Sequence, residues 1–280
     1  MNNPIDPWAE EVRSGERFRF GENWAVFLRQ IDEARIESAE QSLLGMLEVD
    51  ALAGKRFLDV GSGSGLFSLA ARRLGAFVVS FDYDPESVGC TAELRRLWCP
   101  RDDRWKIEQG SVLDRDFLRN LGSYDIVYSW GVLHHTGSMW EALENVASLV
   151  APGGQLFISI YNDQGARSRF WLHVKRAYVR TPRALQWMIL LPSLALLWGP
   201  ALVRRIFSAS VHRAIKSGAP RGMSRWRDAV DWVGGYPFEV AKPEEIINFY
   251  RALGFDIGQL RTCGGAIGCN EFVFRRGKDS

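Results

Sequence analysis

Short apolar runs alternate with longer segments of helical periodicity over residues 56–161. Apolar runs at 56–60, 77–81, 105–109, 124–130 and 155–161 predict strands. The intervening segments predict helices at 66–74, from Pro85 onward and at 138–150. Because a strand followed by a helix and a strand forms a right-handed crossover, this alternation predicts a mainly parallel sheet.

The same kind of pattern returns near the end of the chain. Residues 243–253 predict a helix that opens at a proline, and 255–262 and 270–275 predict two extended runs. At the other end, apolar positions from Arg17 to Leu47 approximate a helical stripe. We therefore expect a helical cap within residues 1–50.

Charge separates the segment 162–235 from the rest of the chain. It holds thirteen Lys or Arg against three Asp, a net charge of +10, which leaves −8 for the other residues. We expect three parts: the cap at 1–50, a core at 51–161 and 236–280, and an insertion at 162–235.

The insertion contains twenty consecutive uncharged residues, 184–203, which is long enough to span a bilayer. Strands expected on both sides belong to one sheet, however, which excludes a single crossing. Pro192 and Gly199-Pro200 predict a break into a bent pair of short helices.

Two interpretations of this insertion stay open. Residues 184–205, rich in Trp and bordered by Arg, can form a peripheral membrane anchor on anionic head groups. Alternatively, the helices form a lid whose apolar face packs on protein. The charged residues in 1–50 predict no signal peptide, and the spacing of the four cysteines predicts a reducing cytoplasmic compartment.

Candidate chemistry begins with the segment Phe57 to Ala71, in which an apolar run meets the sequence Asp59-Val-Gly61-Ser62-Gly63-Ser-Gly65. Glycines at a strand-to-helix turn let backbone N–H groups approach a bound nucleotide. A second apolar run ends at Asp82, where a doubly wound fold places a ribose-binding carboxylate. The third glycine comes one position too early for the dinucleotide fingerprint, which disfavours NAD.

Together with the segment Tyr124 to His135, these motifs resemble class I S-adenosylmethionine-dependent methyltransferases over about 57–161 and 243–276. The segments Ser129 to His135 and Leu149 to Gly154 resemble, more loosely, the ubiquinone-biosynthesis O-methyltransferase branch. The resemblance implies an α/β, Rossmann-like, mainly parallel seven-stranded sheet with a C-terminal antiparallel hairpin. The helical insertion would lie between strands five and six.

The resemblance also implies a binding site for S-adenosylmethionine. Asp59, Gly61, Ser62, Gly63 and Gly65 would surround its methionine part, and Asp82 its ribose. Around the adenine and the transferred methyl group, the implied residues are Tyr83, Ser111, Val112 and Trp130. Ser111 departs from the pattern, since relatives often carry an acidic residue there.

A hydroxyl acceptor benefits from a general base, and imidazole suits that role. His135, with His134 beside it, follows the strand 124–130, and we expect His135 to be the base. The alternative is that both histidines only pack or cap the following helix.

Four residues near the end of the insertion are expected acceptor contacts, with loop packing as the alternative role: Arg225, Asp231, Tyr236 and Glu239. No carboxylate occurs in 130–133, so we expect no metal. Cys263 and Cys269 can form a ligand pair or a redox switch, but a glycine-rich hairpin connection is the simpler interpretation.

The sequence therefore predicts methyl transfer to oxygen of a small or lipid-linked metabolite. Transfer to nitrogen or carbon, and a non-catalytic nucleotide-binding protein, stay open. Nucleic acid is disfavoured as a partner, because the basic segment is apolar at its centre and no RNA-binding module accompanies it.

Overall fold

The computed structural model describes residues 7–207 and 225–278. The chain forms two compact units, each built from two stretches of sequence. The helical unit comprises Met1–Phe18 and Arg169–Pro237, and the sheet unit comprises Arg19–Ser168 and Phe238–Ser280. Residues 19–50 thus belong with the sheet, whereas the sequence suggested a separate cap over 1–50.

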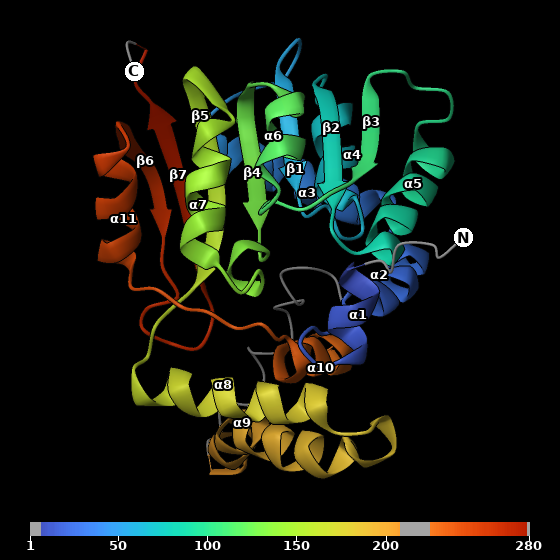
Figure 1. The fold of residues 1–280 in the computed structure, drawn as a ribbon, viewed down its shortest axis with the longest axis vertical. Helices are drawn as coiled ribbons and strands as arrows, with labels where there is room; N and C mark the ends of the chain where they lie inside the picture. The colour runs from blue at the N-terminus through green and yellow to red at the C-terminus, as the bar shows by residue number, and fades with distance from the viewer. Residues whose placement is uncertain (1–6, 208–224, 279–280) are drawn as a thin grey trace. The chain divides into compact units, whose positions relative to one another are not determined.

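The sheet unit is built on a seven-stranded sheet with strand order β3-β2-β1-β4-β5-β7-β6 (Figure 1). Strands β1 to β5 pair in parallel, while β7 is antiparallel to both β5 and β6. This confirms the predicted fold class. The strands are β1 (Arg56–Val60), β2 (Phe77–Asp82), β3 (Trp105–Gln109), β4 (Tyr124–Trp130), β5 (Val150–Tyr161), β6 (Phe255–Arg261) and β7 (Cys269–Arg276).

Helices cover both faces of this sheet. In Figure 1, α3 and α4 lie behind the sheet, and α6 and α7 lie in front of it. The helices of this unit are α2 (Gly21–Phe27), α3 (Glu33–Leu47), α4 (Leu66–Arg73), α5 (Pro85–Trp98), α6 (Arg115–Leu121), α7 (Met139–Ser148) and α11 (Pro243–Ala252), with single turns η1 (Leu28–Gln30) and η2 (Leu133–His135). The stripe expected from Arg17 to Leu47 is therefore divided among α2, η1 and α3.

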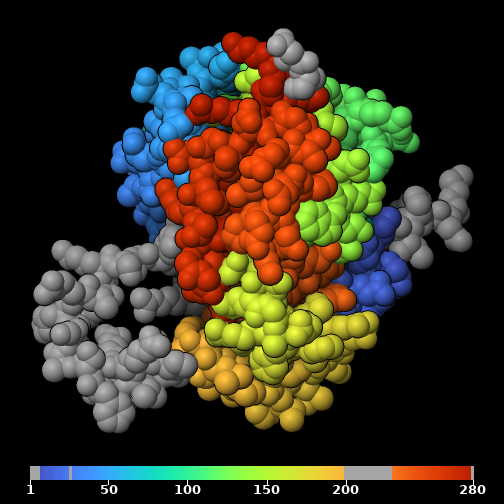
Figure 2. Space-filling model, turned by 90° about the vertical axis from the view of Figure 1, so that its left-hand side faces the viewer, coloured from blue at the N-terminus to red at the C-terminus, as the bar shows by residue number. Residues whose placement is uncertain are grey.

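The larger hydrophobic core lies between the sheet and helices α6, α7 and α11. Tyr250 of α11 is fully buried there, with its ring centroid 4.5 Å from that of Phe274 of β7. Its hydroxyl donates to the carbonyl of Leu143 in α7, 3.1 Å away. One side chain thus joins both helices to the antiparallel end of the sheet. Figure 2 shows the outer surface of this end, formed by α11 and β6, in orange to red.

Aromatic rings fill much of the opposite face. The ring of Tyr128 on β4 lies 5.9 Å from Phe57 on β1, 5.0 Å from Phe67 on α4 and 5.2 Å from Phe157 on β5. Such pairs stabilise a core beyond the area that they bury. They fix α4, the helix that follows the glycine turn, against the middle of the sheet.

A buried polar network lies beside these rings. Ser68 of α4 donates to the Asp59 carboxylate at the end of β1, and its oxygen lies 2.7 Å from that of Ser80 on β2. The indole N–H of Trp105 on β3 donates to Ser80 over 2.8 Å. The network joins three strands and one helix through side chains that are almost completely shielded from water.

The helical unit contains α1 (Pro7–Arg13), most of α8 (Ala166–Arg180), η3 (Arg183–Leu185), α9 (Trp187–Phe207) and α10 (Arg225–Gly234). Its core comprises Tyr178, Leu190, Leu194, Ala229 and Val233. The ammonium of Lys175 is buried, donates to the carbonyl of Trp232 and lies 4.2 Å from the centre of that indole ring. Helices α8, α9 and α10 are thereby joined in one small bundle.

The prediction of two short helices between 184 and 203 is wrong. Helix α9 continues through Pro192 and Gly199-Pro200. Leu190 and Leu194, on either side of Pro192, are both buried in the core of the helical unit. Packing there favours a continuous helix over the break that proline favours. Among the described residues, no helix combines the length and the apolar character needed to cross a bilayer.

Removing the ring of Phe274 should destabilise the sheet unit. Phe274 is 1% exposed, and Phe274→Ala should lower the free energy of unfolding by about 3–5 kcal/mol, because a cavity remains beside Tyr250. Phe77→Ala, at a ring that is 47% exposed, is the control and should cost about 0.5 kcal/mol. Urea unfolding measures both, and equal losses would contradict this view of the core.

Asp59 should make stability depend on pH. Burial raises the pKa of Asp59 to about 7, although the hydrogen bond from Ser68 opposes the rise. Between pH ~4 and pH ~7 the folded chain then holds a proton that the unfolded chain has lost, so stability falls as pH rises.

In Asp59→Asn, the fall in the free energy of unfolding with rising pH should be smaller by up to about 4 kcal/mol, the equivalent of about three pKa units. Urea unfolding at several pH values measures it, with Asp103→Asn, at an exposed carboxylate, as the control. Parallel curves for the Asp59 variant and the unchanged chain would show that Asp59 does not retain a proton on folding.

Candidate functional site

The carboxyl end of β1 turns sharply into α4 through the three glycines. The N–H groups of Gly61 and Ser62 both donate to the carbonyl of Phe81 on β2, over 2.8 and 3.1 Å, and Gly65 N–H donates to the carbonyl of Ser62. The turn is therefore bonded to the neighbouring strand at the point where that strand ends.

Glycine is required at these positions. Gly61, Gly63 and Gly65 have φ angles of 79°, 54° and 80°, in the left-handed region that other residues rarely adopt. Space is also restricted, since a Cβ on Gly61 would lie 2.5 Å from both methyl carbons of Val132, and one on Gly63 would lie 3.0 Å from the indole of Trp24. The turn is thus closely covered by protein.

Asp82, at the end of β2, is bonded to this turn. One carboxylate oxygen accepts from Gly63 N–H over 2.9 Å, and the other accepts from Asp84 N–H over 3.0 Å. These two donors fix the orientation of the carboxylate, and each oxygen can accept a further hydrogen bond. Tyr83 follows directly in the turn that leads to α5, and is partly buried.

The backbone donors of the turn are used differently from the expectation. The sequence suggested that N–H groups of the glycine turn face a ligand, but those of Gly61, Ser62, Gly63 and Gly65 donate to protein oxygens. Closing the turn onto β2 uses these donors. What the three glycines can offer a ligand is their lack of side chains.

Asp59 lies at the end of β1, but its carboxylate is directed into the buried network with Ser68 and Ser80. The side chain is 2% exposed. Asp59 thus supports the turn from beneath, and Asp82 is the carboxylate hydrogen-bonded to the turn itself.

Helix α2, part of the helical segment expected within residues 1–50, covers the glycine turn. Gly21 N–H donates to the carboxylate of Asp84 over 2.8 Å, and Arg19 forms an ion pair with Glu86 at 2.6 Å. Burial raises the pKa of Asp84, while the bond from Gly21 opposes the rise. The aromatic residues around Gly21 indicate that this segment packs on another element, but nothing in their spacing identifies the glycine turn as their partner.

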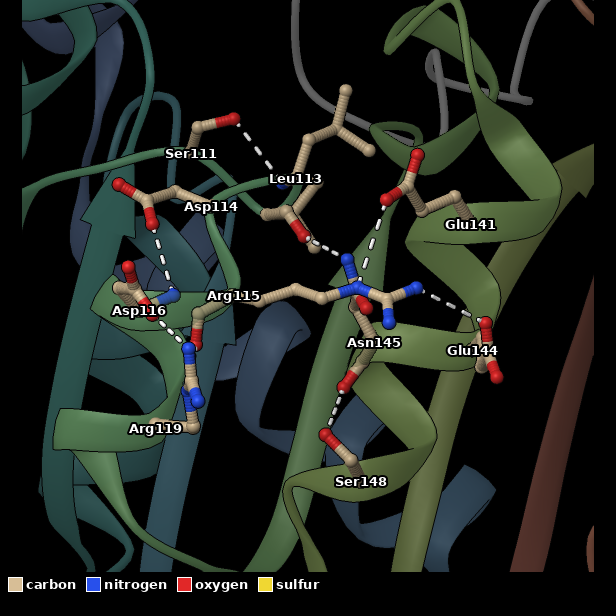
Figure 3. Close-up of polar contacts among 11 residues, drawn as sticks. Ser111, Leu113, Asp114, Arg115, Asp116, Arg119, Glu141, Glu144, Asn145 and Ser148 are labelled. Atoms are coloured by element: carbon tan, nitrogen blue, oxygen red, sulfur yellow. Dashed lines mark hydrogen bonds and ion pairs between the residues drawn. The ribbon is translucent and has the colours of Figure 1, made fainter.

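A local hydrogen bond fixes Ser111 in the loop after β3 (Figure 3). The Ser111 hydroxyl accepts from Leu113 N–H over 3.1 Å, and the Val112 carbonyl accepts from the side-chain amide of Asn145 over 2.9 Å. Asp114 caps α6 through the N–H groups of residues 116 and 117. The main-chain bond from Gly110 to Asp82 then places this loop beside the end of β2.

Trp130, at the end of β4, is held across the sheet. Its indole N–H donates to Glu271 over 2.9 Å, and the other oxygen of Glu271 accepts from Arg261 over 3.1 Å. These residues share one row of the sheet with Ser159, which lies between Trp130 and Glu271 and is fully buried.

His134 and His135 lie in an aromatic cluster directly after β4. The imidazole of His134 is 4.0 Å from the ring of Tyr161, and that of His135 is 4.9 Å from the ring of Phe20. His134 is fully buried, whereas His135 keeps 8% of its surface exposed. Both rings pack within this cluster, and of the two only His135 keeps contact with solvent.

The four expected acceptor contacts are divided between the two units. Glu239 belongs to the sheet unit, where its carboxylate accepts from Met139 N–H over 3.0 Å at the start of α7. Burial raises the pKa of Glu239, and the bonds from the backbone of Met139 and Gly137 oppose the rise. This carboxylate therefore holds the start of α7.

Asp231 and Tyr236 belong to the helical unit. Tyr236 accepts a hydrogen bond from Phe18 N–H at its carbonyl, over 2.9 Å. Arg225 is the first residue of α10, and its side chain lies outside the described part of the structure.

Within the described residues there is no cluster of three or more His, Cys, Asp or Glu side chains that could hold a metal ion. Cys263 donates to the carbonyl of Ala266 over 3.2 Å, in the connection between β6 and β7. This agrees with the hairpin interpretation of that segment.

A family model described as a methyltransferase domain matches residues 31–198. The ubiquinone biosynthesis O-methyltransferase of Burkholderia lata is 35% identical over 127 residues, which are 42% of this chain and 50% of that protein. The chain thus spans about half the length of the curated relatives that it matches.

Solved structures share the fold. The magnesium protoporphyrin IX methyltransferase of Synechocystis PCC 6803, with bound SAH, aligns over 99% of this chain and 90% of that one, at 15% identity and a TM-score of 0.51. The 1,6-didemethyltoxoflavin-N1-methyltransferase of Burkholderia thailandensis aligns over 99% and 93%, at 15% identity and a TM-score of 0.52.

The resemblance to class I S-adenosylmethionine-dependent methyltransferases is therefore confirmed. The match over 31–198 includes the glycine turn, Asp82 and both histidines of the aromatic cluster. The chain belongs to the methyltransferase domain family.

Proposed function

We propose that this protein transfers the methyl group of S-adenosylmethionine to an oxygen of a small or lipid-linked acceptor and releases S-adenosylhomocysteine. The observation that carries this proposal is the bonded unit formed by the three-glycine turn and the Asp82 carboxylate, which joins the ends of β1 and β2.

The chemistry of these residues fits the cofactor. Asp82, held by two backbone donors, would accept hydrogen bonds from the ribose hydroxyls, as the equivalent carboxylate does in doubly wound folds. The turn, with no side chains at Gly61, Gly63 and Gly65, would lie against the methionine part. Tyr83, Ser111 and Val112 would border the adenine.

The cofactor supplies an electrophilic methyl group, and the protein supplies orientation. Methyl transfer from a sulfonium is an in-line displacement, so holding the acceptor oxygen on the axis is the main requirement. We propose that Trp130, fixed by Glu271, borders this axis. Because Trp130 lies in a row that crosses four hydrogen-bonded strands, we expect its side chain to be held rigidly beside the axis.

His135 is the proposed general base. An imidazole can take the proton of an acceptor hydroxyl near neutral pH. Of the two histidines, His135 is the one with an exposed edge, and Phe20 and Tyr161 hold its ring in place. His134 is proposed to support it from the buried side.

Oxygen is proposed as the acceptor atom because the curated relatives are named ubiquinone biosynthesis O-methyltransferases. A nitrogen or carbon acceptor is the second candidate. For acceptor contacts we propose Arg225, Asp231 and Tyr236, since Glu239 is engaged by α7. Membrane contact through 184–205 is a separate proposal, because it depends on side chains of α9 and not on those of the methyl-transfer site.

Cofactor binding can be tested at Asp82. Asp82→Asn removes the charge and one acceptor, and should weaken binding of S-adenosylhomocysteine by roughly 10- to 100-fold, the scale of a lost charged hydrogen bond. Titration calorimetry measures this, with Asp103→Asn, an exposed carboxylate, as the matched control. Unchanged affinity in Asp82→Asn, or binding of NADH instead, would refute the proposed cofactor site.

The base can be tested at His135. His135→Gln should lower kcat at saturating cofactor by about 100-fold, the usual scale for losing a general base, and should leave cofactor affinity unchanged. Incorporation of labelled methyl groups into a cell extract gives the rate, and His173→Gln, at an exposed histidine of α8, is the control. Full turnover in His135→Gln would leave both histidines with a packing role only.

A further inference from the structure

Helix α9 has an entirely apolar exposed side between Trp187 and Trp198. The exposed residues in this stretch are Trp187, Met188, Leu191, Pro192, Ala195, Leu196 and Trp198. Five of these side chains are large, and they are 57%, 57%, 52%, 58% and 44% exposed for Trp187, Met188, Leu191, Leu196 and Trp198. We call these seven residues the α9 face.

The α9 face is distinct from the side of the helix that holds the bundle together. Leu190 and Leu194 lie in the core of the helical unit, and Ser193 is buried with its hydroxyl bonded to the carbonyl of Ile189. At 3.6 residues per turn, the seven exposed positions fall on the opposite half of the helix. The helix is thus apolar on both sides, which is typical of an element with two apolar environments.

A single exposed leucine needs no explanation, but a continuous apolar side with two tryptophans does. Contiguous apolar surface on a protein marks a site of contact with another molecule or a membrane. Tryptophan is enriched where one side of the ring is apolar and the other meets water, as at the boundary of a bilayer.

The exposed charged residues of α8 and η3, which precede the α9 face in the chain, are all arginines. Arg180 ends α8 and Arg183 lies in η3, one turn before Trp187, and both are exposed. On α8 the exposed charged side chains are Arg167, Arg169, Arg176 and Arg180. The sequence contains no Asp or Glu between Asp163 and Asp228.

We propose that the α9 face binds the surface of an anionic lipid bilayer, lying in the plane of the interface. The apolar side chains would enter the boundary of the acyl chains, and Arg180 and Arg183 would contact phosphate groups of the lipids. An interfacial position agrees with the absence of a spanning helix among the described residues.

Charge also distinguishes this occupant from a second copy of the chain. A symmetric dimer through the α9 face would bring the exposed arginines of α8 in both copies together, and α8 itself contains no carboxylate. An anionic membrane supplies the missing negative charge. The binding proposal is independent of methyl transfer, so its test needs no turnover.

Flotation with vesicles tests the proposal. The full chain should float with vesicles of phosphatidylcholine mixed with an equal part of phosphatidylglycerol. The triple variant Trp187→Gln, Met188→Gln, Leu191→Gln should bind these vesicles at least roughly tenfold more weakly. Burying even one large apolar side chain strengthens binding by about tenfold, so the loss of three should exceed this value.

Leu97→Gln is the matched control, because Leu97 of α5 is 52% exposed and lies in the sheet unit. It should leave vesicle binding unchanged. All variants should keep the urea unfolding midpoint and the affinity for S-adenosylhomocysteine, because the altered side chains are exposed.

The charge can be tested separately. Arg180→Gln with Arg183→Gln should weaken binding to the mixed vesicles by roughly fivefold for each arginine and reduce the preference over pure phosphatidylcholine. High salt should also weaken binding of the unchanged chain to the mixed vesicles, because salt screens the attraction between arginines and lipid phosphates.

Three results would overturn the proposal. The first is failure of the full chain to float with the mixed vesicles, and the second is flotation of the triple variant equal to that of the unchanged chain. The third is a dimer in solution that the triple variant dissociates, which would assign the α9 face to a second copy.

Discussion

The site depends on one main-chain constraint, the double use of the Phe81 carbonyl at the end of β2. Gly61 and Ser62 both donate to it, so the turn after β1 is fixed to the neighbouring strand. Asp82, the next residue, then reaches back to Gly63. The parallel pairing of β1 and β2 thus sets the positions of the glycine turn and of Asp82 relative to each other.

Much of this arrangement could be predicted from the sequence. Short apolar runs separated by helical segments define parallel strands, and the carboxyl ends of such strands meet at one edge of the sheet. Strands 56–60, 105–109 and 124–130 have the predicted bounds. The tight turn after the first strand could also be predicted from its three glycines, because few other residues tolerate positive φ angles.

Other features depend on long-range packing and could not be predicted. The direction of the Asp59 side chain is set by Ser68 and Ser80, which local patterns do not connect to it. Glu239 caps a helix that begins one hundred residues earlier in the chain. Pro192 favours a helix break locally, but buried leucines on either side favour continuity.

The order of strands in the sheet has a consequence for how the chain is made. Strand β7, which pairs with β5, is the last strand to leave the ribosome, after the whole helical insertion. Until then β5 presents an unpaired edge, a feature that invites association between chains. The insertion therefore lengthens the period during which a nascent chain depends on protection from aggregation.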